Sequence, residues 1–132
     1  LYSITQFDYE FRFPTTMGKE STSTSTLSLK IPANYPKELL PIEIRIASND
    51  INPQYCGVEV SNTSEVDGGA GWNNWFVKKY ESEDVIGTTQ EIVVKNARTN
   101  NYGTTGKFYV KANYYNGGYE KTKAKEFTFT YR

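Results

Sequence analysis

Aromatic and aliphatic residues alternate with polar ones along this chain, and this pattern restricts it to β structure. In Phe7–Phe13 an aromatic ring occupies every second position and charged residues lie between them. Ile42–Ile46 repeats the pattern, with Glu43 and Arg45 on the opposite face. A period of two residues is typical of a strand with one buried and one wet face. Both segments are therefore expected to be half-buried strands, the first ending at Pro14 because proline cannot donate to a ladder.

The same reasoning predicts about seven or eight short strands, separated by turns. No segment shows a convincing apolar repeat of helical period. The expected loops and turns include Lys37–Leu40 as one helical turn, Asn49–Pro53 as a turn, and Asn116–Gly118 as a tight turn that pairs the last two strands. The polar stretch at residues 15–26 is expected to be a surface loop, with a glycosylated segment as the alternative. The predicted strands lie at residues 7–13, 27–31, 42–46, 56–60, 75–80, 90–95, 108–114 and 122–132.

Many short strands with regular turn signals favour an antiparallel β-sandwich of immunoglobulin-like or related Greek-key architecture, with a barrel as the alternative. The 132 residues fit one domain, so residues 1–132 are expected to form a single sandwich. The Cys…Trp…Cys spacing of antibody domains is absent, because Cys56 is the only cysteine. We expect Cys56 to be a buried structural thiol.

The charge balance and the missing residue types argue against several functions. Fifteen basic and fifteen acidic residues cancel, whereas a nucleic-acid partner calls for a basic excess. No apolar run is long enough to span a bilayer. There is no histidine, which removes histidine triads and histidine metal sites. The chain is therefore expected not to be an enzyme and to need no metal or cofactor.

The acidic loop residues and the loop aromatics remain as candidates for catalysis or binding. Glu81, Glu83 and Asp84 are neighbours in a predicted turn, which does not supply the opposed carboxylates of a glycosidase. They are expected to be solvated, with calcium binding as the alternative. The glycine-rich segment at 67–71 lacks the lysine and helix of a phosphate loop. Aromatic rings beside amides suit sugar binding, since rings stack on sugar faces and amides both donate and accept. The candidate ligand-binding residues are Trp72, Asn73, Asn74, Trp75 and Tyr102, and Tyr55, Tyr115 and Tyr119 also fall in or beside predicted loops.

The linear order of several segments resembles fimbrillin-like cell-surface domains of Bacteroidota bacteria. The resemblance rests on the segments Tyr9–Pro14, Leu40–Ile46, Asn49–Pro53 and Gly106–Tyr115. It implies a β-sandwich of an exported, lipid-anchored or fibre-forming protein. The anchoring cysteine of such lipoproteins has no counterpart here, since Cys56 lies mid-domain, so a lipid anchor would lie outside this chain. We accordingly expect the chain to be the C-terminal part of a longer exported protein.

These observations favour a non-enzymatic domain for adhesion or fimbria-like assembly at the bacterial cell surface or outer membrane. The expected partners are other surface-protein subunits or glycans, with no nucleic acid. Strand addition at an exposed sheet edge would link subunits, and Thr122–Arg132 is the candidate edge. The alternative is a carbohydrate-binding module that uses the loop aromatics.

Overall fold

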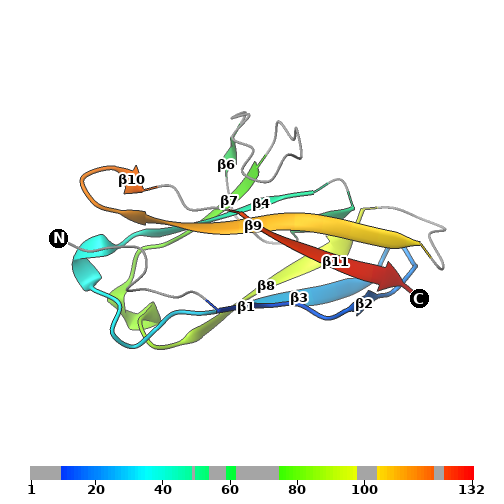
Figure 1. The fold of residues 1–132 in the computed structure, drawn as a ribbon, viewed down its shortest axis with the longest axis horizontal. Coiled ribbons are helices and arrows are strands. Elements are labelled where there is room, and N and C mark those ends of the chain that lie inside the picture. Colours follow the sequence, from blue (N-terminus) through cyan, green and yellow to red (C-terminus); the bar gives the residue numbers. More distant parts are fainter. Residues whose placement is uncertain (1–9, 49, 54–58, 62–74, 98–103, 121–123) are drawn as a thin grey trace.

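The computed structural model describes residues 10–48, 50–53, 59–61, 75–97, 104–120 and 124–132, and these form two packed β-sheets (Figure 1). The smaller sheet has the order β1-β3-β8-β5 and the larger one β2-β11-β9-β4-β7-β6, with β10 paired to β9. All pairings are antiparallel except that of β2 with β11. The strands are β1 (Glu10–Arg12), β2 (Thr16–Met17), β3 (Thr24–Lys30), β4 (Ile42–Ala47), β5 (Ile51–Pro53), β6 (Glu59–Ser61), β7 (Trp75–Tyr80), β8 (Thr89–Asn96), β9 (Thr105–Tyr115), β10 (Tyr119–Glu120) and β11 (Lys125–Tyr131).

The predicted β-sandwich is confirmed, and its connectivity is immunoglobulin-like. Taking β1, β3, β4, β5, β8, β9 and β11 in chain order as strands A to G gives the sheets ABED and CFG of the constant-type domain. The hairpin β6–β7 is inserted after β5 and extends the larger sheet beyond β4. The first strand divides between the sheets, because β1 pairs with β3 and β2 pairs with β11.

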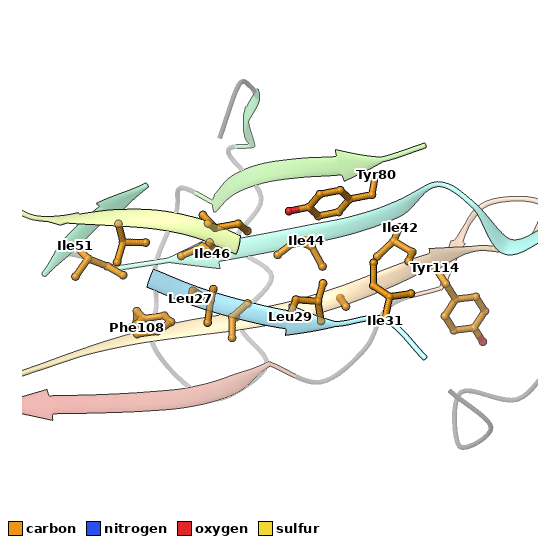
Figure 2. Close-up of a cluster of buried hydrophobic side chains, with 14 of the residues drawn as sticks. Leu27, Leu29, Ile31, Ile42, Ile44, Ile46, Ile51, Tyr80, Phe108 and Tyr114 are labelled. Carbon is orange, nitrogen blue, oxygen red and sulfur yellow. The ribbon is translucent and has the colours of Figure 1, made fainter. Parts of the chain in front are cut away.

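The core lies between the two inner faces and follows the alternation of the sequence. Figure 2 shows Leu27 and Leu29 of the smaller sheet, and Ile31 directly after β3, against Ile42 and Ile44 of the larger sheet. Each of these five residues is at most 1% exposed, so each contributes about 1.5–3 kcal/mol of burial free energy. Rings fill the end of the core near the C-terminus, where Phe108 contacts Phe13, Phe127 and Phe129.

The eight predicted strands correspond to β1, β3, β4, β6, β7, β8, β9 and β11, and the described residues contain three further short strands. The expectation that residues 15–26 form a loop is wrong in part, since β2 and the first residues of β3 fall there and Met17 is buried. The expected turn at Asn49–Pro53 contains β5, whose Ile51 is fully buried. Strands β2 and β5 are too short to show a periodic pattern, and each pairs with a strand that is distant in the sequence.

The predicted turns near three strand ends are confirmed. Lys37–Leu39 forms the short 3-10 helix η2, and Glu83–Val85 forms η3. Gly117 has φ +75°, a conformation that favours glycine, and the Asn116 N–H donates to the Gly118 carbonyl at 2.8 Å. This turn joins β9 to β10 directly, and β11 pairs with β9 further along, where Lys125 lies opposite Val110.

The outer face of β4 differs from the half-wet strand that the alternation suggested. Glu43 is 3% exposed, and its Oε1 accepts from Arg45 Nε at 2.5 Å and from Asn113 Nδ2 at 3.2 Å. On β9, Lys111 and Asn113 are each 1% exposed. Strand β4 lies between β9 and β7, so Val77 and Lys111 flank Arg45 on this face. Alternation fixes which face a residue is on, but neighbouring strands decide whether that face is wet.

Candidate functional site

The most distinctive surface feature of the described residues is the outer edge of β11, which is only partly paired. On one side, Lys125–Thr130 pair with β9. On the other side, β2 pairs with Thr130 and Tyr131 alone. Within the described parts of the chain, the segment Lys125–Phe129 therefore has no strand beside it on its outer side.

The direction of the backbone groups along this edge follows from the hydrogen bonds at its end. The Thr130 N–H donates to the Thr15 carbonyl and the Arg132 N–H to the Met17 carbonyl, both at 2.9 Å and both on the outer side. The Tyr131 N–H instead donates inward, to the Thr104 carbonyl at 2.9 Å. Because these directions alternate along a strand, the N–H groups of Glu126 and Thr128 also point outward.

The opposite strand supports this assignment. Thr128 lies across from Lys107 in the ladder. The Lys107 N–H donates to Asp50 Oδ2 at 2.9 Å, and the Lys107 carbonyl accepts from Ser48 Oγ at 2.8 Å. Lys107 therefore turns its backbone groups away from β11, as expected for a pair that shares no ladder bond. The hydrogen bonds of Thr130–Arg132 and those of Lys107 therefore agree that the Thr128 N–H points outward, away from β9.

The side chains on this edge combine an apolar inner face with charged neighbours. Phe127 is half-buried and stacks on Phe108, with ring centroids 5.2 Å apart. Lys125 Nζ lies 4.9 Å from the centroid of the Phe127 ring. Glu126 Oε2 accepts a 2.6 Å hydrogen bond from the Tyr109 hydroxyl, and this bond, together with burial, raises the pKa of Tyr109. Exposed charges at Lys125 and Glu126 limit indiscriminate pairing along the edge.

The expected edge Thr122–Arg132 is thus narrower in the structure. Its last residues are covered by β2, and residues 121–123 lie outside the described part. Phe129 and Tyr131 are 2% and 1% exposed, so removal of the C-terminal segment would open the core. The segment available for pairing is Lys125–Phe129.

Of the predicted ligand-binding residues, the described part of the chain includes Trp75 alone. Trp72, Asn73, Asn74 and Tyr102 lie outside the described residues, and so do Cys56 and Tyr55. Trp75 is the first residue of β7, where its backbone pairs with Ser61 of β6. A sugar site built on these residues stays a prediction.

The turn that contains η3 and the Asn116–Gly118 turn between β9 and β10 both lie at the end of the sandwich away from the C-terminus (Figure 1). Glu81, Glu83 and Asp84 are exposed, as the sequence suggested. Within the described residues no group of three histidine, cysteine or acidic side chains is placed to hold a metal ion. A recess of about 410 Å³ lies beside η3 and is lined by Tyr35, Lys37, Glu83, Asp84 and Ile86.

A second feature of this end is an aromatic pair whose ring contact the sequence did not predict. Tyr115 and Tyr119 lie opposite each other on β9 and β10, with ring centroids 5.6 Å apart at 81°. Lys79 Nζ lies 5.6 Å from the centroid of the Tyr119 ring. Tyr115 is 40% exposed and is the exposed large apolar side chain among the described residues. The placement of both tyrosines beside Asn116–Gly118 was the one sequence signal for this pair.

No helix within the described residues is long and apolar enough to cross a membrane.

Comparison with known proteins adds a family relationship. Neither a curated protein nor a solved structure matches the chain. A family model described as the FimE C-terminal domain matches residues 7–130, which include every strand of the two sheets except the final residue of β11. The chain therefore belongs to the FimE C-terminal domain family, a fimbria-related family.

Proposed function

We propose that this domain is a non-enzymatic structural unit of a bacterial surface fimbria, and that the open edge of β11 joins it to another subunit. The family relationship supports the fimbrial context. The edge supports the mode of joining, because an unpaired strand segment binds a second strand through main-chain hydrogen bonds. The lack of histidine in the sequence argues against the commonest acid–base and nucleophilic machinery.

The incoming strand would lie beside Lys125–Phe129, in line with β2. The N–H groups of Glu126 and Thr128 would donate to it, just as those of Thr130 and Arg132 donate to the β2 segment. Phe127 lies on the core side of this position, so an apolar residue on the incoming strand would cover the exposed part of its ring. Lys125 and Glu126 would favour a partner strand with complementary charges.

A proline at position 128 tests the edge with little effect on the rest of the fold. Thr128 is exposed, and its N–H points away from β9, so Thr128→Pro removes an outer donor without removing a ladder bond. Thr128→Ala is the matched control, because it shortens the side chain and keeps the N–H. Sedimentation velocity of the chain at increasing concentration measures association.

We expect the native chain and Thr128→Ala to associate and Thr128→Pro to stay monomeric, with similar thermal unfolding of all three. A native chain that stays monomeric at every concentration would contradict self-assembly through this edge. Equal association of the proline variant would show that the interface lies elsewhere.

The location and source follow as part of the same proposal. We propose that the domain acts at the surface of a bacterium of the Bacteroidota, where a lipid anchor outside this chain holds the protein at the outer membrane and the assembled protein serves adhesion. The motif resemblance and the fimbria-related family support this location. Antibody labelling of intact cells would detect the domain, and labelling only after lysis would refute a surface location.

A further inference from the structure

The loops at the end of the sandwich away from the C-terminus are the counterpart of a known ligand-binding position. The β3–β4 connection, the β7–β8 connection and the β9–β10 turn lie at this end (Figure 1). In chain order the first and third correspond to the B–C and F–G loops of immunoglobulin domains, which in variable domains form the binding end. This end lies away from the β2–β11 contact, so a ligand bound there is compatible with assembly at the β11 edge.

Tyr115 is the exposed member of the tyrosine pair at this end, and Tyr119 is partly buried. The turn between β9 and β10 is closed by the Asn116–Gly118 hydrogen bond and by the positive φ of Gly117. A cross-strand aromatic pair adds stability to such a turn. Tyr115 nevertheless remains 40% exposed, whereas Tyr114, the next residue inward along β9, is 5% exposed and packs in the core.

Charged groups act on the Tyr119 side chain, and Lys79 Nζ lies 5.6 Å from the centroid of its ring. The pKa of Tyr119 is raised chiefly by burial of its phenol, and the carboxylates of Glu43 and Glu81 also raise it, while the charge of Lys79 lowers it. Lys79 and Glu81 are exposed, and both belong to the end of β7 and the residues that follow it. The exposed ring of Tyr115 thus lies against the Tyr119 ring, which in turn has the Lys79 ammonium beside it.

This combination matches the chemistry of a sugar more closely than that of other ligands. A pyranose has an apolar C–H face that stacks on an aromatic ring, and hydroxyls that both donate and accept hydrogen bonds. A phenol and a carboxylate accept such bonds, and an ammonium and a phenol donate them. Lys79 is the cation beside the Tyr119 ring, and the carboxylates of Glu43 and Glu81 act on the same phenol, so the local charge does not favour an anionic ligand.

We propose that Tyr115, Tyr119 and Lys79 form a binding site for a neutral pyranose sugar, which stacks on the Tyr115 ring. The site is separate from the loop residues Trp72–Trp75 and Tyr102 that the sequence suggested. It would allow an assembled fimbrial domain to hold a glycan at its free end.

Nuclear magnetic resonance titration of the ¹⁵N-labelled chain with methyl β-galactopyranoside and methyl β-glucopyranoside, each at millimolar concentration, tests the site. We expect at least one of the two sugars to shift the amide signals of Tyr115, Asn116 and Tyr119. Tyr115→Ala should weaken that binding by about tenfold or more, equivalent to a loss of about 1.4 kcal/mol. Tyr115→Phe, which keeps the ring, should bind within about twofold of the native chain, a difference of about 0.4 kcal/mol.

Three results would overturn the proposal. One is the absence of any shift at these amides with both sugars. Another is binding that Tyr115→Ala leaves unchanged while Lys37→Ala, in the recess beside η3, abolishes it. The third is binding of glucuronate alone, which would show an anion site and not a site for neutral sugars. The spectrum of each variant without sugar shows whether it is folded.

Discussion

Removal of the Glu43 carboxylate tests the buried polar layer on the outer face of the larger sheet. Glu43 is 3% exposed and holds Arg45 and Asn113 through two hydrogen bonds to one oxygen. In Glu43→Ala the guanidinium loses a charged partner, and Asn113, 1% exposed, loses an acceptor. Breaking a fully buried ion pair costs about 3–5 kcal/mol. The Arg45 side chain is 16% exposed, so water compensates in part and we expect about 3 kcal/mol.

Thermal and urea unfolding measure this loss. For a domain of this length, about 3 kcal/mol lowers Tm by roughly 12 °C. Glu43→Gln keeps an acceptor of the same shape and should lose only about half as much. In the double variant Glu43→Leu with Arg45→Met, both charges are replaced by apolar groups, so most of the stability should return. A Glu43→Ala variant within about 0.5 kcal/mol of the native chain would show that the carboxylate does not stabilise this layer, since that is the range of ordinary surface substitutions.

Two further predictions concern the contact between β9 and β11. A Cβ at Gly106 would lie 2.5 Å from the Phe129 ring, which is buried, so Gly106→Ala should destabilise the domain by about 1–3 kcal/mol in urea unfolding; an unchanged midpoint would show that the ring has room to move. The hydrogen bond to Glu126 and burial raise the pKa of Tyr109 in the folded chain. The neutral phenol therefore stabilises the fold below about pH 10, the pKa of an unfolded tyrosine. This contribution is lost as the pH rises through the pKa of Tyr109 in the folded chain. Tyr109→Phe should therefore show a weaker loss of stability above about pH 10 than the native chain, and identical alkaline unfolding of the two would contradict the assignment.

The longer strands could be predicted because their burial follows a local pattern. Leu27, Leu29 and Ile31 show their inward face by alternation alone, and so do Phe108 and Val110. Residues of this kind mark one face of a strand wherever the opposite sheet covers it. The sandwich follows from many such strands without a helical repeat.

The short strands and the extent of the open edge could not be predicted, because they depend on contacts between distant parts of the chain. Met17 is buried through the parallel pairing of β2 with Tyr131 at the other end of the sequence. The sequence pattern predicts that Asp50 lies in a turn, yet its carboxylate accepts a hydrogen bond from the backbone N–H of Lys107 on β9. Which part of β11 stays open is decided by where β2 ends, and no local signal in Lys125–Tyr131 carries that information.

The binding residues illustrate a different limit. The sequence predicts a sugar site at Trp72 and Trp75, since large rings beside asparagines and glycines suit sugar binding. The described structure instead presents Tyr115 and Tyr119, which the pattern placed beside a turn without indicating that their rings meet. Ring contacts across a turn depend on register, which the structure gives as Tyr119 opposite Tyr115.

Hydrogen exchange along β11 tests directly whether a second strand is added at its open edge. In the monomer the outward N–H groups of Glu126 and Thr128 should exchange rapidly, whereas those of Phe127 and Phe129, which point towards β9, should be protected. On assembly we predict that Glu126 and Thr128 become protected while Phe127 and Phe129 change little. If assembly leaves Glu126 and Thr128 exchanging as fast as in the monomer, no strand is added at this edge and the account is contradicted.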